Sequence, residues 1–185
     1  MKVFAFAASL RKDSWNKKLC NLAVDLAQKQ GVDVDHADFR EFDMPYYDGD
    51  LQASSGFPAG AQKLAKRIAD SDAWILTSPE YNYSVPGTIK NAIDWLSRMN
   101  PMPFRGKNAL LISASISLVG GIRGLWQLRI PLEGCGCWVH PDMYALATAQ
   151  NSFDESGRLK DPALGKRLED LIADYLRAAK ALDAR

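Results

Sequence analysis

The segment Ser78-Pro-Glu-Tyr-Asn-Tyr-Ser-Val-Pro-Gly-Thr-Ile-Lys-Asn-Ala-Ile-Asp-Trp95 follows the apolar run Ala73-Trp-Ile-Leu-Thr77. The apolar run is typical of a buried parallel strand, and apolar residues recur at helical spacing from Ile89 to Leu96. The polar and aromatic residues between them are therefore expected to connect a strand to a helix. In an open parallel sheet, such connections line the crevice beyond the carboxyl ends of the strands, where ligands bind.

The residue types of this connection suit a flat heteroaromatic ring. Tyr81 and Tyr83 offer faces for stacking, while Asn82 and the backbone amides offer donors and acceptors for a ring edge. Pro79 and Pro86 stiffen the segment. The alternative is that both tyrosines cover hydrophobic surface and that Asn82 caps a turn.

The segment from Pro79 to Trp95 closely resembles the signature of the NAD(P)H-dependent FMN reductases. These belong to the flavodoxin-like superfamily and include bacterial quinone, chromate and azo-dye reductases. The resemblance implies an enzyme that binds FMN, takes hydride from NADH or NADPH and reduces a small-molecule electron acceptor. It further implies a homodimer or homotetramer, and a cofactor-binding site that includes Pro79, Glu80, Tyr81, Asn82 and Tyr83.

The segment Ser9-Leu-Arg-Lys-Asp-Ser-Trp-Asn16 lies between a predicted strand and a predicted helix. At such a junction, unpaired N–H groups and the positive end of the helix dipole favour an anion. Arg11 adds a fixed charge, and neutral donors come from Ser9, Ser14 and Asn16. This set fits the terminal phosphate of a nucleotide.

A mononucleotide is favoured over a dinucleotide, because Ala7 and Ala8 stand where close approach to a pyrophosphate would require glycine. The alternative is that Ser14 or Asn16 merely caps the helix and that Arg11 is solvated. The flavin reductases use a similar serine, arginine and asparagine pattern as their FMN phosphate site, so the resemblance implies the same role here.

A third candidate loop is Ala114-Ser-Ile-Ser-Leu-Val-Gly-Gly-Ile-Arg-Gly124, which follows a predicted strand. Its paired glycines allow close approach of the backbone, and its hydroxyls can bind a polar ring edge. In the family, the equivalent turn lies along the isoalloxazine. The resemblance therefore implies flavin contacts at Ser115, Gly120 and Gly121 and leaves open whether Ser117 also contacts the flavin.

Strand signals alternate with helix signals along the chain, which predicts an α/β fold. We expect a flavodoxin-like, doubly wound, three-layer sandwich with a five-stranded parallel sheet of order 2-1-3-4-5. The predicted strands are residues 2–8, 32–36, 73–77, 109–113 and a fifth in two pieces, 137–139 and 143–147. The three polar loops follow neighbouring strands, so they should open on one edge of the sheet. Residues 40–60 are expected to form a long loop near the site.

Composition narrows the possible classes of protein. With 185 residues, 47% of them apolar, the whole chain 1–185 is expected to form a single domain. A net charge of +1 gives no footprint for nucleic acid or an anionic membrane. Three cysteines cannot all pair, and Cys135-Gly-Cys137 lacks the partners of a zinc site, so we expect reduced thiols and no metal. Without a signal-like or membrane-spanning segment, the protein is expected to be cytoplasmic.

No side chain need act as an acid or base, because the flavin would supply the chemistry; for Glu80 a structural ion pair or a subunit contact is the favoured role. The rival function is a flavodoxin-like electron carrier that does not oxidise pyridine nucleotides; a binding module with a degraded site ranks last. A strongly one-signed docking surface, typical of carriers, is absent from this near-neutral chain. Trp95, Met99 and Trp126 suggest a subunit contact, with ordinary core packing as the alternative.

Overall fold

The computed structural model describes residues 1–183 and contains one parallel sheet. Its strands are β1 (Lys2–Ala7), β2 (Asp33–Asp38), β3 (Ala73–Thr77), β4 (Asn108–Ala114), β5 (Trp138–Val139) and β6 (Tyr144–Leu146). The order is β2-β1-β3-β4-β5, and β6 pairs with β4 farther along the same edge. The predicted order is confirmed, and so is the division of the last strand into two pieces around His140-Pro141.

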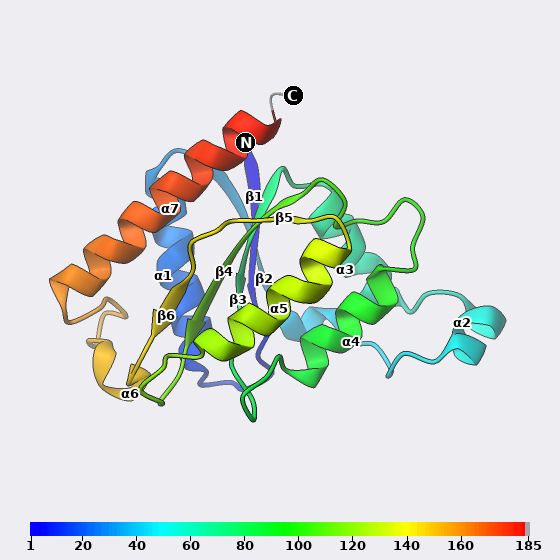
Figure 1. Cartoon of the computed structure of the whole chain (residues 1–185), viewed down its shortest axis with the longest axis horizontal. Coiled ribbons are helices and arrows are strands. Elements are labelled where there is room, and N and C mark those ends of the chain that lie inside the picture. The colour runs from blue at the N-terminus through cyan, green and yellow to red at the C-terminus, as the bar shows by residue number, and fades with distance from the viewer. Residues whose placement is uncertain (184–185) are drawn as a thin grey trace.

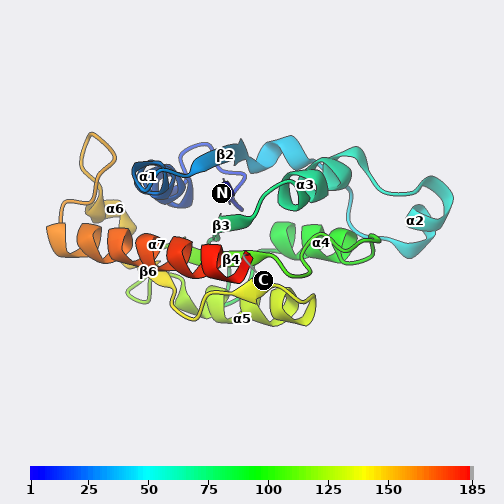
Figure 2. The same cartoon turned by 90° about the horizontal axis from the view of Figure 1, so that it is seen from above.

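Helices cover both faces of the sheet, as Figure 1 shows. They are α1 (Trp15–Lys29), the 3₁₀ helix η1 (Phe39–Phe42), α2 (Gly49–Ser55), α3 (Ala59–Ala69), α4 (Gly87–Leu96), α5 (Ile122–Gly134), α6 (Ala149–Ser152) and α7 (Pro162–Asp183). Seen from above, α1 and α7 lie on one side of the sheet and α3, α4 and α5 on the other (Figure 2). Within residues 1–183, no helix is long and apolar enough to cross a membrane.

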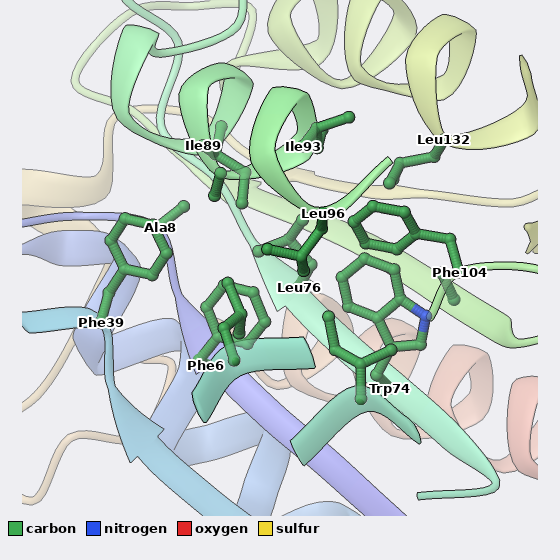
Figure 3. Packing of buried hydrophobic residues seen from close by; sticks show 14 of the residues in the cluster. Phe6, Ala8, Phe39, Trp74, Leu76, Ile89, Ile93, Leu96, Phe104 and Leu132 are labelled. Atoms are coloured by element: carbon green, nitrogen blue, oxygen red, sulfur yellow. The ribbon is translucent and has the colours of Figure 1, made fainter. Parts of the chain in front are cut away.

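The core consists of two apolar layers, one on each face of the sheet. Alternate strand residues point to opposite faces, so Phe4 and Phe6 pack toward α3, α4 and α5, while Val3 and Ala5 pack toward α1 and α7. Figure 3 shows the first layer, where Phe6 and other strand side chains lie beneath Leu96 of α4. Burial on both faces explains why the strands are continuous apolar runs in the sequence.

Tyr175 fixes α7 to the middle of the sheet. Its hydroxyl lies 2.8 Å from the carbonyl oxygen of Trp74 and 2.9 Å from that of Asn108, and it accepts the N–H of Trp74 at 3.1 Å. The side chain is buried, and burial raises its pKa well above the usual value. One hydroxyl on α7 thus serves backbone groups of both β3 and β4.

The prediction that residues 40–60 form only a loop was wrong, because this stretch contains the end of η1 and all of α2. Asp48 caps α2 by accepting two backbone N–H groups of its first turn, but α2 buries none of its residues. A helix without a buried face leaves no apolar periodicity in the sequence. Asn91 of α4 holds the stretch before α2, accepting the N–H of Tyr47 at 2.7 Å and donating to the carbonyl of Pro45 at 2.9 Å.

The large apolar side chains proposed for a subunit contact divide into two groups. Trp95 is completely buried and donates its indole N–H to the carbonyl of Pro45, and Met99 packs against the core. Ordinary core packing therefore explains both residues. Trp126 differs, because 56% of it is exposed on α5.

Candidate functional site

Three loops meet at the carboxyl edge of the sheet: the first loop (residues 8–14), the second loop (78–86) and the third loop (115–121). They follow β1, β3 and β4, which are neighbours in the sheet. Asn16, just after the first loop, bonds Ala114, just before the third loop. Glu80 of the second loop bonds the start of α5. The topology thus brings the predicted loops together.

The first loop ends in a capped helix. Ser14 lies at the N-cap of α1, and its Oγ accepts the backbone N–H of Asn16 at 3.2 Å. Ser9 and Ser14 are both buried, whereas Arg11 is exposed. The N–H groups and the dipole of the 15-residue α1 face this loop. Buried hydroxyls, a helix N-terminus and an exposed cation are groups that can surround a phosphate.

The side chain of Asn16 is turned away from the first loop. Its Nδ2 donates to the carbonyl of Ala114 at 2.8 Å, and its Oδ1 accepts the Ala114 N–H at 3.0 Å. The residue is buried. This amide therefore joins α1 to the end of β4, and sequence reasoning missed the contact because its partner lies 98 residues away.

The second loop contains a tight two-residue turn. Tyr81 and Ser84 exchange backbone hydrogen bonds of 3.1 and 3.0 Å, and Asn82 and Tyr83 at the tip have φ values of 49° and 67°. Left-handed angles at both central positions define a type I′ turn. Tyr81 is 46% exposed and Tyr83 67% exposed, so neither tyrosine covers the core. Pro79 is buried at the base of the loop.

Glu80 anchors the second loop to α5. Its carboxylate accepts hydrogen bonds from Arg123 and from the N–H of Gly124, each at 3.0 Å, and its side chain is only 6% exposed. Both carboxylate oxygens are engaged, so this residue forms the structural ion pair. The guanidinium of Arg123 also lies over the ring of Tyr83, 4.3 Å from its centre, and covers part of that ring.

The third loop turns on two glycines in left-handed conformations, Gly120 with φ of 65° and Gly121 with φ of 89°. A Cβ on Gly120 would lie 2.8 Å from the backbone of Ala145, and one on Gly121 would lie 2.1 Å from the Oγ of Ser113. Both positions therefore require glycine. Both glycines are buried, and the turn packs directly against the ends of β4 and β6 with no side chain between.

Hydroxyl groups stiffen the other half of the third loop. Ser115 Oγ lies 3.1 Å from Ser117 Oγ and accepts the Ser117 N–H at 3.2 Å. Beside them, Ile116 is 66% exposed and Leu118 is 87% exposed. These two apolar residues were missed in the sequence, because residues without a partner in the core follow no periodic pattern.

The cysteines lie away from these loops and are not disulfide-bonded. Cys20 is buried in the layer between α1 and the sheet, and Cys137 is buried beside β5. Burial raises the pKa of both thiols to about 12, so they are neutral and poorly reactive at physiological pH. Cys135, which is partly exposed, also has a raised pKa because of burial.

The site therefore offers a helix start suited to an anion, a glycine turn packed closely on the strand ends, and exposed tyrosine rings on a tight turn. Together they fit a phosphorylated, planar heteroaromatic ligand, and FMN meets each requirement. With the observed strand order, these features define a flavodoxin-like mononucleotide-binding protein.

Sequence comparison identifies the family. The family model for NADPH-dependent FMN reductases matches residues 1–151. A curated relative, an NAD(P)H-dependent FMN reductase of Pseudomonas aeruginosa, is 36% identical over 181 residues, covering 96% of this chain and 92% of that protein. A quinone reductase of Escherichia coli is 40% identical over 129 residues, covering 70% and 68% of the two chains. This chain belongs to the NADPH-dependent FMN reductase family.

Structural comparison agrees with that assignment. The flavoenzyme NAD(P)H:(acceptor) oxidoreductase of Paracoccus denitrificans superposes with a TM-score of 0.84 at 31% identity, over 97% of each chain. The predictions of the flavodoxin-like fold, of an oxidoreductase, and of FMN with NAD(P)H as co-substrate are confirmed.

Proposed function

We propose that the three loops hold FMN and that the protein transfers reducing equivalents from NADH or NADPH to a small-molecule acceptor. The observation that carries this proposal is the meeting of the glycine turn of the third loop with the tyrosine turn of the second, beside the capped start of α1. Bound FMN supplies the two-electron redox chemistry. The protein's own groups bind and orient the cofactor.

The first loop is proposed to bind the phosphate. Ser9 and Ser14 would donate hydroxyl hydrogens, the N–H groups of the first turn of α1 would add backbone donors, and Arg11 would close over the anion. Arg11 is exposed, so its charge is available to a ligand. Asn16 would support this loop indirectly, because its side chain joins the start of α1 to Ala114 of β4.

The second and third loops are proposed to hold the ring. Tyr81, Asn82 and Tyr83 would face it from the turn above Pro79, and Ser115, Gly120 and Gly121 would line its polar edge through backbone and hydroxyl groups. Glu80 would act indirectly, because Arg123 and Gly124 already bind its carboxylate. No side chain of the site is assigned the role of a general acid or base.

A quinone is the acceptor that the relatives support best, since curated proteins similar to this chain are named quinone reductases. Azo compounds, metal oxyanions and free flavin would approach the same exposed ring.

The proposed activity is tested by anaerobic spectroscopy of the protein loaded with FMN. NADH or NADPH alone should bleach the oxidised flavin spectrum, and a quinone should then restore it. Because both substrates would use the cofactor in turn, steady-state rates should give the parallel lines of a ping-pong scheme. If neither nucleotide bleaches the flavin while a separate reductase protein does, the chain is an electron carrier instead.

We also propose a homodimer or a homotetramer. Trp126 and Ile130 lie one turn apart on the outer face of α5, 56% and 71% exposed, and Trp138 of the adjoining β5 is 59% exposed. Large apolar groups gathered in this way favour contact with another protein surface. Sedimentation should show a multimer at micromolar concentration, and Ile130→Glu should shift it toward monomer. A wild-type monomer would contradict the proposal.

The whole chain 1–185 is proposed to be one domain. Beyond the family-matched residues 1–151, α7 packs on α1 and completes the second apolar layer. A single cooperative unfolding transition is therefore expected by both circular dichroism and tryptophan fluorescence, and two separate transitions would contradict it. The free thiols and the use of NAD(P)H support a cytoplasmic location.

A further inference from the structure

Asn16 makes an unusual pair of hydrogen bonds between two loops of the site. Both ends of its side-chain amide bind one residue, Ala114, at 2.8 Å to the carbonyl and 3.0 Å from the N–H. The bonds are buried and join positions 98 residues apart. A side-chain amide has the same donor and acceptor as a peptide group, so it can replace a neighbouring strand.

The position of this contact in the sheet explains why Ala114 needs a side-chain amide in place of a neighbouring strand. β3 pairs with β4 only as far as Thr77 opposite Ile112, so Ala114 extends beyond the end of β3. On its other side, β4 continues along β6, where Ser115 donates its N–H to the carbonyl of Leu146. The amide of Asn16 thus completes the sheet at the residue that precedes the third loop.

The other end of the contact lies in the proposed phosphate site. Asn16 is in the first turn of α1, and its backbone N–H is held by the Oγ of Ser14. A continuous chain of bonds therefore runs from Ser14 through Asn16 to Ala114, and on to the backbone of Ser115. These bonds connect the helix start, where an anion would bind, to the start of the third loop.

We propose that Asn16 is a positioning residue that couples the two ends of the cofactor site. Occupation of the first loop by phosphate fixes the start of α1, and Asn16 then holds the third loop in the arrangement that accepts the ring. This inference rests on the proposed binding of FMN at these loops. It assigns Asn16 no direct contact with the phosphate.

The coupling can be measured by binding the two parts of FMN separately, with riboflavin as the ring and inorganic phosphate as the anion. In the wild-type protein, phosphate should tighten riboflavin binding about fivefold relative to chloride at equal ionic strength. Phosphate alone should also slow hydrogen exchange at the Ala114 amide and in the third loop. Both readouts are independent of catalytic turnover.

Asn16→Ala should abolish the effect of phosphate and weaken riboflavin about tenfold, because two buried hydrogen bonds are lost, and FMN about fiftyfold, because FMN also loses the fivefold coupling. Asn21→Ala is the matched control, since Asn21 is exposed on the same helix and should leave all affinities unchanged. Asn16→Asp keeps the acceptor for the Ala114 N–H but loses the donor. This variant should also lose the coupling, and it provides the test of the proposal if Asn16→Ala does not fold.

Each alternative gives a different pattern. A loss confined to FMN, with riboflavin unaffected, would make Asn16 a direct phosphate ligand and overturn the proposal. A lower melting temperature with unchanged coupling would reduce Asn16 to a stabilising residue. If the wild-type protein binds riboflavin equally well with and without phosphate, the proposed coupling is refuted but the proposed function is not. If the protein binds no flavin at all, the proposed function itself is refuted.

Discussion

Replacement of Gly121 by alanine tests whether the third loop depends on close packing against β4. The residue has φ of 89°, a conformation that alanine adopts poorly. An added Cβ would lie 2.1 Å from the Oγ and 3.0 Å from the Cβ of Ser113. Ser113 is fully buried, and within residues 1–183 its hydroxyl has no hydrogen-bond partner.

The magnitude follows from two separate terms. The left-handed conformation costs a residue with a Cβ about 1–2 kcal/mol. Forcing a methyl group into a filled site costs about 1–3 kcal/mol more. Gly121→Ala should therefore destabilise the protein by about 2–5 kcal/mol. Ser113→Ala should be close to neutral, because it removes a hydroxyl that forms no bond.

A double-mutant cycle separates the two terms, with unfolding in urea as the assay. The double variant Ser113→Ala, Gly121→Ala should recover about 1–2 kcal/mol by removing the nearest clash and should retain the backbone strain. Gly134→Ala is the control on α5, since a Cβ there meets no other atom within contact distance. If the double variant is no more stable than Gly121→Ala, the contact with Ser113 is not the source of the packing term.

Three further changes test other parts of the structure. Arg11→Ala should weaken FMN by about 1.5–3 kcal/mol and leave riboflavin nearly unchanged in fluorescence titrations; equal losses would place Arg11 away from the phosphate. Tyr175→Phe should lower the free energy of unfolding by about 1–3 kcal/mol, measured in urea, because the buried N–H of Trp74 loses its bond to the hydroxyl. Asp38→Asn should lose about 0.5 kcal/mol near neutral pH, since the hydrogen bond from Lys17 lowers the pKa of the exposed Asp38 carboxyl. Because the pKa of Asp38 is lower in the folded protein than in the unfolded chain, the ionised carboxylate stabilises the fold at a pH above its unfolded pKa. This stabilisation is lost as the pH falls through the folded pKa, so the unfolding curves of variant and wild type should converge in acid.

The sheet could be predicted from sequence because its strands are buried on both faces. The run Ala73–Thr77 is completely apolar apart from its last residue, and Asn108–Ala114 is nearly so, which leaves few alternatives to a central parallel strand. Asp33–Asp38, in contrast, places Val34 and Ala37 among polar residues, as expected for a half-exposed strand at the sheet edge. Periodicity therefore predicted the strands and the edge position of β2, which agrees with the order 2-1-3-4-5.

The short helices could not be predicted in the same way. α2 contains two serines, a glycine and an aspartate within seven residues, and it buries none of them. It depends on the cap at Asp48 and on its attachment through the preceding residues to Asn91. Local capping and one long-range amide bond leave no repeated pattern in the sequence.

For the site, sequence reasoning located the loops better than it assigned their side chains. Strand ends and glycine pairs identify where the loops must be, because those features are local. The partners of Asn16 and Glu80 lie far away in sequence, and Ala114 and Gly124 use backbone groups that any residue could supply. A structural ion pair was one of the two roles expected for Glu80, but the sequence could not identify its partners, nor show that the Asn16 side chain faces the protein.

These inward-facing contacts have a consequence for cofactor binding. Glu80 fixes the second loop to α5, Asn16 fixes the first loop to β4, and Gly121 packs directly on Ser113. These contacts hold much of the loop structure without a ligand, and the proposed coupling through Asn16 would add the remaining order when phosphate binds. Ligands gain affinity when the groups that bind them need little ordering, so in the proposed site most of the interaction energy at Ser9, the tyrosines and the third loop would remain available to hold the cofactor. Of the polar side chains that sequence alone would count as ligands, Asn16 and Glu80 instead bond to the protein and hold the loops in place.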